Sequence, residues 1–421
     1  MISSIKDRTI NGLLWSFIES FSLKGIQFII GVVMARFLFP ADYGLIAMLA
    51  IFLGISGIFI DGGFTTALIQ KKDRTELDFC TIYYFNILAS LVIYLMLFIA
   101  APLIATFYNL PELSIITRVI SLSLVFASFS AVIRTKLTIA VDFKTQAKVS
   151  LMAVSLSGVI GLVMAYNDFG VWSLIAQSLI NTVTQTLLLF YFVNWRPKFM
   201  FSIDSFKSLF SFSSRLVLSQ LISTVYANLY ALVIGKQFNS YELGVYSRGE
   251  SFSQFPSATI SNVLSRVTFP LLSSISEDDI RLKGIYMKYI KFTSFIVFPI
   301  MFFLIAVASP LVELLLTNKW IDTVIILQIL CLGFMWDPIG FLNINLLYIK
   351  GKPQSILNLE IVKKLVAVLI LFSSISFGLT FIAVGRACYS FMAVFINIHF
   401  TRKLINFGYV DQFKLVFPYF C

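Results

Sequence analysis

Nine basic side chains lie in or at the edges of apolar segments of this chain, where a charge is expensive. A charged side chain near the centre of a bilayer costs roughly 2.5–3.5 kcal/mol even on a lenient insertion scale. Basic groups in such places must pair with acids or line a hydrated cavity, where they can bind an anion. The predicted substrate ligands are Lys24, Arg215, Arg248, Arg266, Lys364 and Arg386.

The spacing of these residues indicates a shared cavity. Arg248 and Arg266 are 18 residues apart, which is five helical turns and a rise of about 27 Å along one face. Lys24 and Arg215 each belong to a stripe of polar residues that recurs every three or four positions. Such a ladder suits an anionic substrate that must be held from either side of a membrane.

Acidic residues within the apolar segments predict a second activity, the coupling of transport to entry of H⁺ or Na⁺. These residues are Glu19, Asp61, Glu250 and Asp337. Asp61 precedes Gly62-Gly63 and Asp337 precedes Pro338, so both lie where an irregular helix is expected. An ionisable group beside a broken helix is a common ion site. A merely structural role for Asp61 and Asp337 stays open.

Less specific explanations also remain for several of the basic residues. Side chains near the ends of apolar segments can reach the interface, so that their charges stay in water. This alternative applies to Arg36, Arg118 and Arg386. Lys363 and Lys364 follow Glu360 by one helical turn, which favours a structural ion pair equally well.

Enzymatic chemistry is not expected. His399 is the only histidine, so no histidine cluster can hold a metal or act with a nucleophile. No phosphate-binding G-x-x-x-x-G-K-[ST] loop is present. The acidic run 277–279 is typical of a solvated loop, and Cys80, Cys331, Cys388 and Cys421 are expected to be small buried hydrophobes. No cofactor is predicted beyond the coupling ion.

The elements that position these residues are predicted to be membrane-spanning helices. Of 421 residues, 58% are hydrophobic and only 13% are charged, about half the charge of a soluble domain. The fold class is therefore an all-α, polytopic membrane protein with apolar segments of spanning length. The twelve predicted spans are 12–36, 44–69, 80–106, 114–135, 147–165, 170–193, 209–236, 243–272, 290–316, 322–348, 356–376 and 379–401.

Charge in the loops predicts the orientation. About two thirds of the 32 Lys and Arg residues fall in every second loop or near the termini. The positive-inside rule places those loops and both termini in the cytoplasm. The net charge of +11 is explained by this topology and by anionic membrane lipids, so nucleic acid is not an expected partner.

An internal duplication is predicted from a shift of 200 residues. It aligns Arg36 with Lys236 and Gly44 with Gly244. Six spans precede the basic segment 194–208 and six follow it, so the repeat is parallel, with a pseudo-two-fold axis along the membrane normal. The predicted parts are an N-terminal lobe (1–193), a cytoplasmic linker (194–208), a C-terminal lobe (209–401) and a cytoplasmic tail (402–421).

Short motifs in a consistent order resemble a known family. They include Ala35-Arg36-Phe37-Leu38, Asp42-Tyr43-Gly44-Leu45, Asp61-Gly62-Gly63-Phe64, Asp142-Phe143-Lys144-Thr145-Gln146, Gly170-Val171-Trp172, Arg266-Val267-Thr268-Phe269-Pro270 and Glu360-Ile361-Val362-Lys363-Lys364. Together they resemble the colanic-acid-exporter branch of the polysaccharide transporters, within the multidrug/oligosaccharidyl-lipid/polysaccharide flippase superfamily.

The resemblance implies a flippase for undecaprenyl-diphosphate-linked oligosaccharide repeat units in a bacterial inner membrane. It implies work alongside a polysaccharide polymerase and chain-length machinery. Members of the family continue into further C-terminal helices, and the ending 417–421 resembles the start of a thirteenth helix. Three alternatives remain: a cation-coupled multidrug exporter of the same superfamily, a polysaccharide polymerase or ligase, and a non-transporting assembly subunit.

Overall fold

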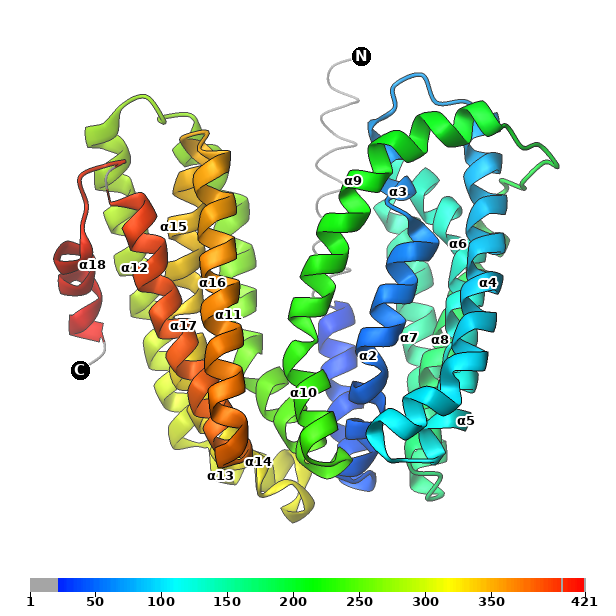
Figure 1. Ribbon diagram of the computed structural model, residues 1–421, viewed down its shortest axis with the longest axis horizontal. Helices are drawn as coiled ribbons and strands as arrows, with labels where there is room; N and C mark the ends of the chain where they lie inside the picture. The colour runs from blue at the N-terminus through cyan, green and yellow to red at the C-terminus, as the bar shows by residue number, and fades with distance from the viewer. Residues whose placement is uncertain (1–21, 403, 420–421) are drawn as a thin grey trace. The chain divides into compact units, whose positions relative to one another are not determined.

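The protein is built from α-helices in two compact units, residues Met1–Leu243 and Gly244–Cys421 (Figure 1). The computed structural model describes residues 22–402 and 404–419, except for the side chains of residues 212, 215, 265–267 and 270. Packing therefore divides the chain after Leu243, within the first turn of the helix Ser240–Ser273, and the segment 194–208 falls inside the first unit.

The first unit begins with a helical stretch over residues 22–37. Its further helices are α2 (Pro40–Asp61), α3 (Phe64–Gln70), α4 (Glu76–Tyr108), α5 (Glu112–Ile120), α6 (Leu122–Ile139), α7 (Phe143–Tyr166), α8 (Val171–Phe192), α9 (Ile203–Ala227) and α10 (Leu229–Gln237). α6 and α7 both pack against α8, and α9 packs against α2, α3 and α4. Phe64, Leu68 and Leu209 lie in a buried core that joins α3 to α9.

The second unit starts with one long helix, α11 (Ser240–Ser273). The other helices are α12 (Asp279–Ala306), α13 (Ala308–Leu316), α14 (Thr323–Phe334), α15 (Asp337–Ile349), α16 (Pro353–Ser374), α17 (Leu379–Thr401) and α18 (Tyr409–Val416), with short 3₁₀ turns at Asn318–Trp320, Ile375–Phe377 and Phe417–Tyr419. α17 is central, because α14, α15 and α16 all pack against it.

Helix breaks occur where glycine and proline predict them. Gly62 and Gly63 have φ of 55° and 73°, a left-handed conformation that separates α2 from α3 directly after Asp61. α15 begins at Asp337, with Pro338 in its first turn, where the missing N–H costs nothing. Both acidic residues therefore lie beside interrupted helices, as expected.

The chain is a multi-pass membrane protein. Eight helices in the described part of the chain are long and apolar enough to cross a membrane, and the pair 216–227 and 229–237, bent by 43°, makes a ninth candidate. The predicted span 12–36 falls partly outside the described residues. Spans 243–272 and 356–376 are occupied by α11 and α16, which are long enough but interrupted by charges such as Arg248, Glu250 and Lys363.

Cysteine burial follows the prediction at two positions and departs from it at a third. Cys80 and Cys331 are buried among helices, as expected of small hydrophobes. Cys388 is exposed on α17, so the prediction was wrong there. The cause is helical periodicity: Tyr389 and Ser390 take the buried positions next to it. Cys421 lies outside the described residues.

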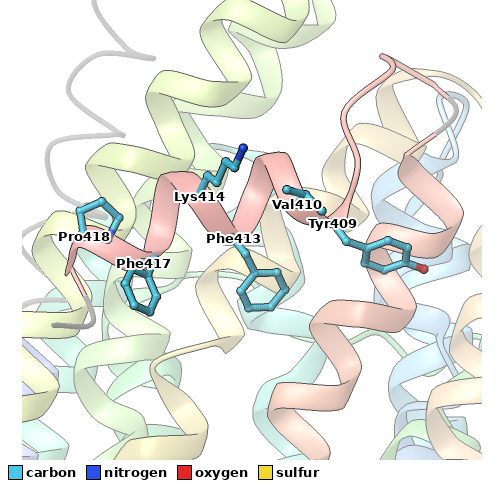
Figure 2. A pocket seen from close by; sticks show the side chains of 6 residues that line it. All are labelled: Tyr409, Val410, Phe413, Lys414, Phe417 and Pro418. Carbon is cyan, nitrogen blue, oxygen red and sulfur yellow. The ribbon is translucent and has the colours of Figure 1, made fainter.

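A buried amide network attaches the C-terminal helix α18 to the second unit. Asn343 on α15 donates to the Gln412 side-chain oxygen at 3.2 Å, and Gln412 donates back to the Asn343 oxygen at 3.3 Å. Thr401 donates to the same Asn343 oxygen at 2.8 Å. All three side chains are buried. Figure 2 shows that Phe413, Phe417 and Tyr409 stand out from α18, and they line a surface hollow with Lys414.

We predict that Asn343→Leu lowers the stability of the protein. The substitution leaves the buried Gln412 amide without this partner, and such an orphaned group costs about 1–3 kcal/mol, whereas Thr401 keeps the Asn397 carbonyl as an acceptor. The melting temperature of the purified protein should fall by about 2–4 °C for each kcal/mol. Asn358→Leu is the matched control, because Asn358 is exposed on α16. Equal melting temperatures for the two variants would contradict a stabilising role for the network.

Candidate functional site

Four helices of the second unit bring opposite charges together in its interior. Glu250 lies on α11, Asp337 on α15, Lys363 on α16 and Arg386 on α17. Asp337 is within electrostatic range of Arg386 and Lys363, and Glu250 is within range of Arg386 and Asp337. We call these four residues, with Glu360 and Ser390, the buried charge cluster; Lys363 and Ser390 are buried, and the other four side chains are half-buried. In a low-dielectric interior such charges persist only because each has opposite charges nearby.

Arg386 lies at the centre of this cluster and is held on several sides. Its Nη1 donates to Ser390 Oγ at 2.8 Å, one turn further along α17. Its guanidinium carbon lies 4.9 Å from the ring centroid of Phe334 and 5.4 Å from that of Tyr389. Ser390 also hydrogen-bonds the Asp337 carboxylate, so one hydroxyl bridges the base and the acid. Cation–π contact strengthens as the cation loses water.

A glycine on α14 permits this arrangement. A Cβ at Gly333 would lie 2.7 Å from the Cα of Ala387, closer than real side chains approach a backbone. Small residues at membrane helix interfaces allow such close contact. The contact joins α14 to α17 one residue away from both Phe334 and Arg386, and so it sets the ring against the guanidinium.

The ion-pair interpretation of the α16 lysines holds for Lys363. Its Nζ lies 2.7 Å from Glu360 Oε1, one turn earlier on the same helix, and Lys363 is only 9% exposed. Lys364 is half-buried one position further along α16, and its spacing from Glu360 also places it on a neighbouring part of the helix surface. Counting all five charges, three acids face two bases, which leaves a formal charge of −1.

Arg248 occupies a separate place in the second unit. Its guanidinium carbon lies 5.7 Å from the ring of Trp320, which is fully buried in the turn after α13. The neighbouring Gly249 lets α11 pack closely on Ile326 and Leu327 of α14. The guanidinium is half-buried, and it is a planar group of the kind that pairs with phosphate through two parallel N–H donors.

In the first unit the predicted residues differ in their exposure and in their hydrogen bonds. Lys24 is exposed near the start of the helical stretch 22–37. Asp61 is half-buried at the end of α2 and accepts a 2.5 Å hydrogen bond from Thr65 Oγ1, which in turn accepts one from Thr135 at 3.4 Å. Glu19 lies outside the described residues, as do the side chains of Arg215 and Arg266. The proposed Arg248–Arg266 ladder therefore stays a prediction.

The described part of the chain thus offers basic groups of the kind that pair with anions and, in the buried charge cluster, carboxylates that can take up a proton. Sequence reasoning missed Ser390, Trp320 and Phe334. Ser390 carried a signal, because a polar residue four positions after Arg386 shares its helical face. The aromatic rings carried none, since Phe and Trp are common in any apolar segment. Among the residues that the structure describes, no group of three His, Cys, Asp or Glu side chains could hold a metal.

Comparison with known protein families identifies the family of this chain. Residues 33–325 match the family described as "Polysaccharide biosynthesis protein". The chain belongs to this family. Among curated members of similar sequence, the teichuronic acid biosynthesis protein TuaB of Bacillus subtilis is 24% identical over 83% of this chain and 73% of its own length. The lipopolysaccharide biosynthesis protein WzxC of Escherichia coli is 25% identical over 80% and 70% of the two chains.

Two solved membrane proteins share the fold of this polysaccharide biosynthesis protein. The lipid II flippase MurJ in an inward closed conformation superposes with a TM-score of 0.75 and 14% identity, over 97% of this chain and 90% of that one. An inward-facing multidrug transporter of the MATE family gives 0.69 and 16%, over 90% and 94%. The family resemblance inferred from the motifs is confirmed, and so is a transporter rather than an enzyme.

We predict an energetic coupling between Arg386 and Asp337. Arg386→Met alone leaves two acids without their central base, and Asp337→Asn alone leaves Arg386 without one of its two acidic partners. The double variant restores the balance, so the two effects on unfolding free energy should fail to add by about 0.5–3 kcal/mol. Thermal or chemical unfolding of the four proteins in detergent measures this difference. Additivity within about 0.3 kcal/mol would show that the two groups do not interact.

Proposed function

We propose that the protein is a flippase that moves lipid-linked oligosaccharide repeat units across the bacterial inner membrane during surface polysaccharide synthesis. The observation that carries this proposal is the family match over residues 33–325, combined with basic side chains set within membrane-spanning helices. The substrate class is undecaprenyl-diphosphate oligosaccharide. Its diphosphate supplies the anion, and its prenyl tail stays in lipid.

The proposed architecture has twelve spans in two lobes, residues 1–193 and 209–401, related by a pseudo-two-fold axis along the membrane normal. The linker 194–208, the tail 402–421 and both termini face the cytoplasm, as the distribution of basic loops favours. Transport follows from alternating access between the lobes. The delivered repeat units feed a polysaccharide polymerase and its chain-length machinery.

Lys24, Arg215, Arg248, Arg266 and Lys364 are proposed to neutralise the diphosphate and any acidic sugars. Arg248 is the best-placed of these in the described structure, because the Trp320 ring supports one side of its guanidinium. Arg386 was also assigned to substrate from the sequence. Its contacts with Ser390, Phe334 and Tyr389 favour a different role, as the fixed base of the buried charge cluster.

The buried charge cluster is the proposed coupling site for H⁺ or Na⁺. Its formal charge of −1 leaves room for one monovalent cation, and binding that cation would complete its neutralisation. Glu250 and Asp337 are the acids that receive it. Asp61 and Glu19 are proposed to contribute in the first lobe. Transport by proteoliposomes with an imposed sodium gradient or proton gradient tests the coupling. A transport rate that neither gradient changes would contradict it.

Deletion of the gene tests the flippase assignment directly. Surface polysaccharide should disappear, and lipid-linked repeat units should accumulate in the cytoplasmic leaflet. Expression of this 421-residue chain should restore export. Absence of accumulation, or sensitivity of the deletion strain to cationic drugs instead, would shift the assignment to polymerisation or to drug export.

Arg248→Gln is expected to abolish repeat-unit export without lowering the amount of protein in the membrane. The substitution removes a charge that contacts substrate but keeps the size and polarity of the side chain. Arg36→Gln is the matched control, because Arg36 is exposed near a helix end and should export normally. Quantifying surface polysaccharide and membrane protein in parallel checks the result, and normal export by the Arg248 variant would remove this residue from the site.

A further inference from the structure

A segment of the first unit crosses the ends of several helices instead of spanning with them. It comprises residues 194–211, and we call it the crossing segment. In Figure 1 the first turns of α9 run across the ends of α4 and α3 before the helix turns alongside α2.

The inner side of the crossing segment is fixed to the unit beneath it. Trp195 Nε1 donates to Glu76 Oε2 at 2.7 Å, and the Ser202 backbone N–H donates to Thr81 Oγ1 at 3.1 Å. The Phe206 ring lies 4.8 Å from that of Phe85. The segment is therefore held at a defined height on the helix ends and does not hang free as a linker.

The outer side of the same segment combines exposed apolar and basic side chains. Phe199 is 96% exposed, Phe201 54% and Ile203 62%. Lys198 and Lys207 are exposed beside them, together with one acid, Asp204. Aromatic and aliphatic groups interleaved with lysine are typical of segments that lie in the plane of a membrane interface.

The lipid-facing surface of α4 leads directly to this outer side. Leu88, Leu91 and Leu95 are 63%, 48% and 58% exposed and recur at helical spacing along one face of α4. Tyr84 begins the same face, and the Phe199 ring stacks on it at 5.7 Å between centroids and 17° between planes. Phe199 thus continues a stripe that already faces the acyl chains, which identifies lipid as the surface that covers it.

We propose that the crossing segment is an interfacial anchor for anionic lipid. Phe199, Phe201 and Ile203 enter the boundary between headgroups and acyl chains, and Lys198 and Lys207 bind lipid phosphates. The anchor itself rests on the geometry above. Its assignment to the cytoplasmic leaflet rests on the orientation given under the proposed function.

Fluorescence quenching by lipid tests the anchor without requiring transport. A single cysteine replaces Phe199 in a background in which the four native cysteines are substituted, and it is labelled with the environment-sensitive fluorophore NBD. The protein is placed in phosphatidylcholine vesicles with brominated acyl chains. Quenching at position 199 should be at least twofold stronger than at Lys72→Cys, an exposed position on the loop between α3 and α4. Equal quenching at both positions would overturn the anchor.

A second comparison tests the lipid charge. With a spin-labelled quencher on phosphatidylglycerol, quenching of the label at 199 should exceed that by spin-labelled phosphatidylcholine about twofold or more. Lys198→Glu with Lys207→Glu should remove this preference, whereas Lys148→Glu, an exposed lysine on α7, should leave it. A preference that survives the double reversal would overturn lipid binding by these lysines.

The leaflet is tested separately from the anchor. In vesicles of known protein orientation, a quencher restricted to the leaflet at the cytoplasmic side should quench the label. Quenching only from the opposite leaflet would overturn the cytoplasmic assignment and the proposed orientation together. Absence of repeat-unit accumulation in the deletion experiment would contradict the proposed function but would have no bearing on either quenching result.

Discussion

The structure depends on one constraint: charges within membrane-spanning helices must find partners inside the protein. In the second unit, helices α11, α15, α16 and α17 each contribute at least one ionisable group to the buried charge cluster. No single helix could insert its charge at low cost, but the assembled group offsets most of it. The packing of α17 against three neighbours is therefore an electrostatic requirement as well as a steric one.

Sequence patterns predicted the parts of the fold that follow from local chemistry. The helix breaks at Gly62-Gly63 and Pro338 come from backbone preferences of those residues alone, and most apolar segments became helices near their predicted ends. The membrane positions of α11 and α16 were harder to predict from sequence, because charges interrupt these helices. Their place in the membrane depends on partners that other helices supply. Periodicity alone could not choose whether Lys363 or Lys364 would pair with Glu360, since both spacings lie on a helical face.

The candidate site shows the same limit more sharply. The charged residues were visible in the sequence, because a charge in an apolar segment is rare. Their grouping was not visible in the sequence, because Glu250 and Arg386 are more than a hundred residues apart and meet only through tertiary packing. Residues without charge, such as Ser390 and Phe334, gain their role from Arg386 alone. The linker was predicted as a loop, but its attachment through Trp195 and Phe206 needed the helix ends of the first unit.

The amide network around Asn343 has a consequence for biogenesis. Asn343 is buried on α15, yet its partner Gln412 lies 69 residues later in the chain. During synthesis α15 is inserted before residue 412 has left the ribosome. Until then the Asn343 side chain lacks its contact with Gln412, and it lies in an apolar setting or binds water that is later expelled. The second unit can therefore complete this polar contact only after residue 412 has been synthesised, late in translation.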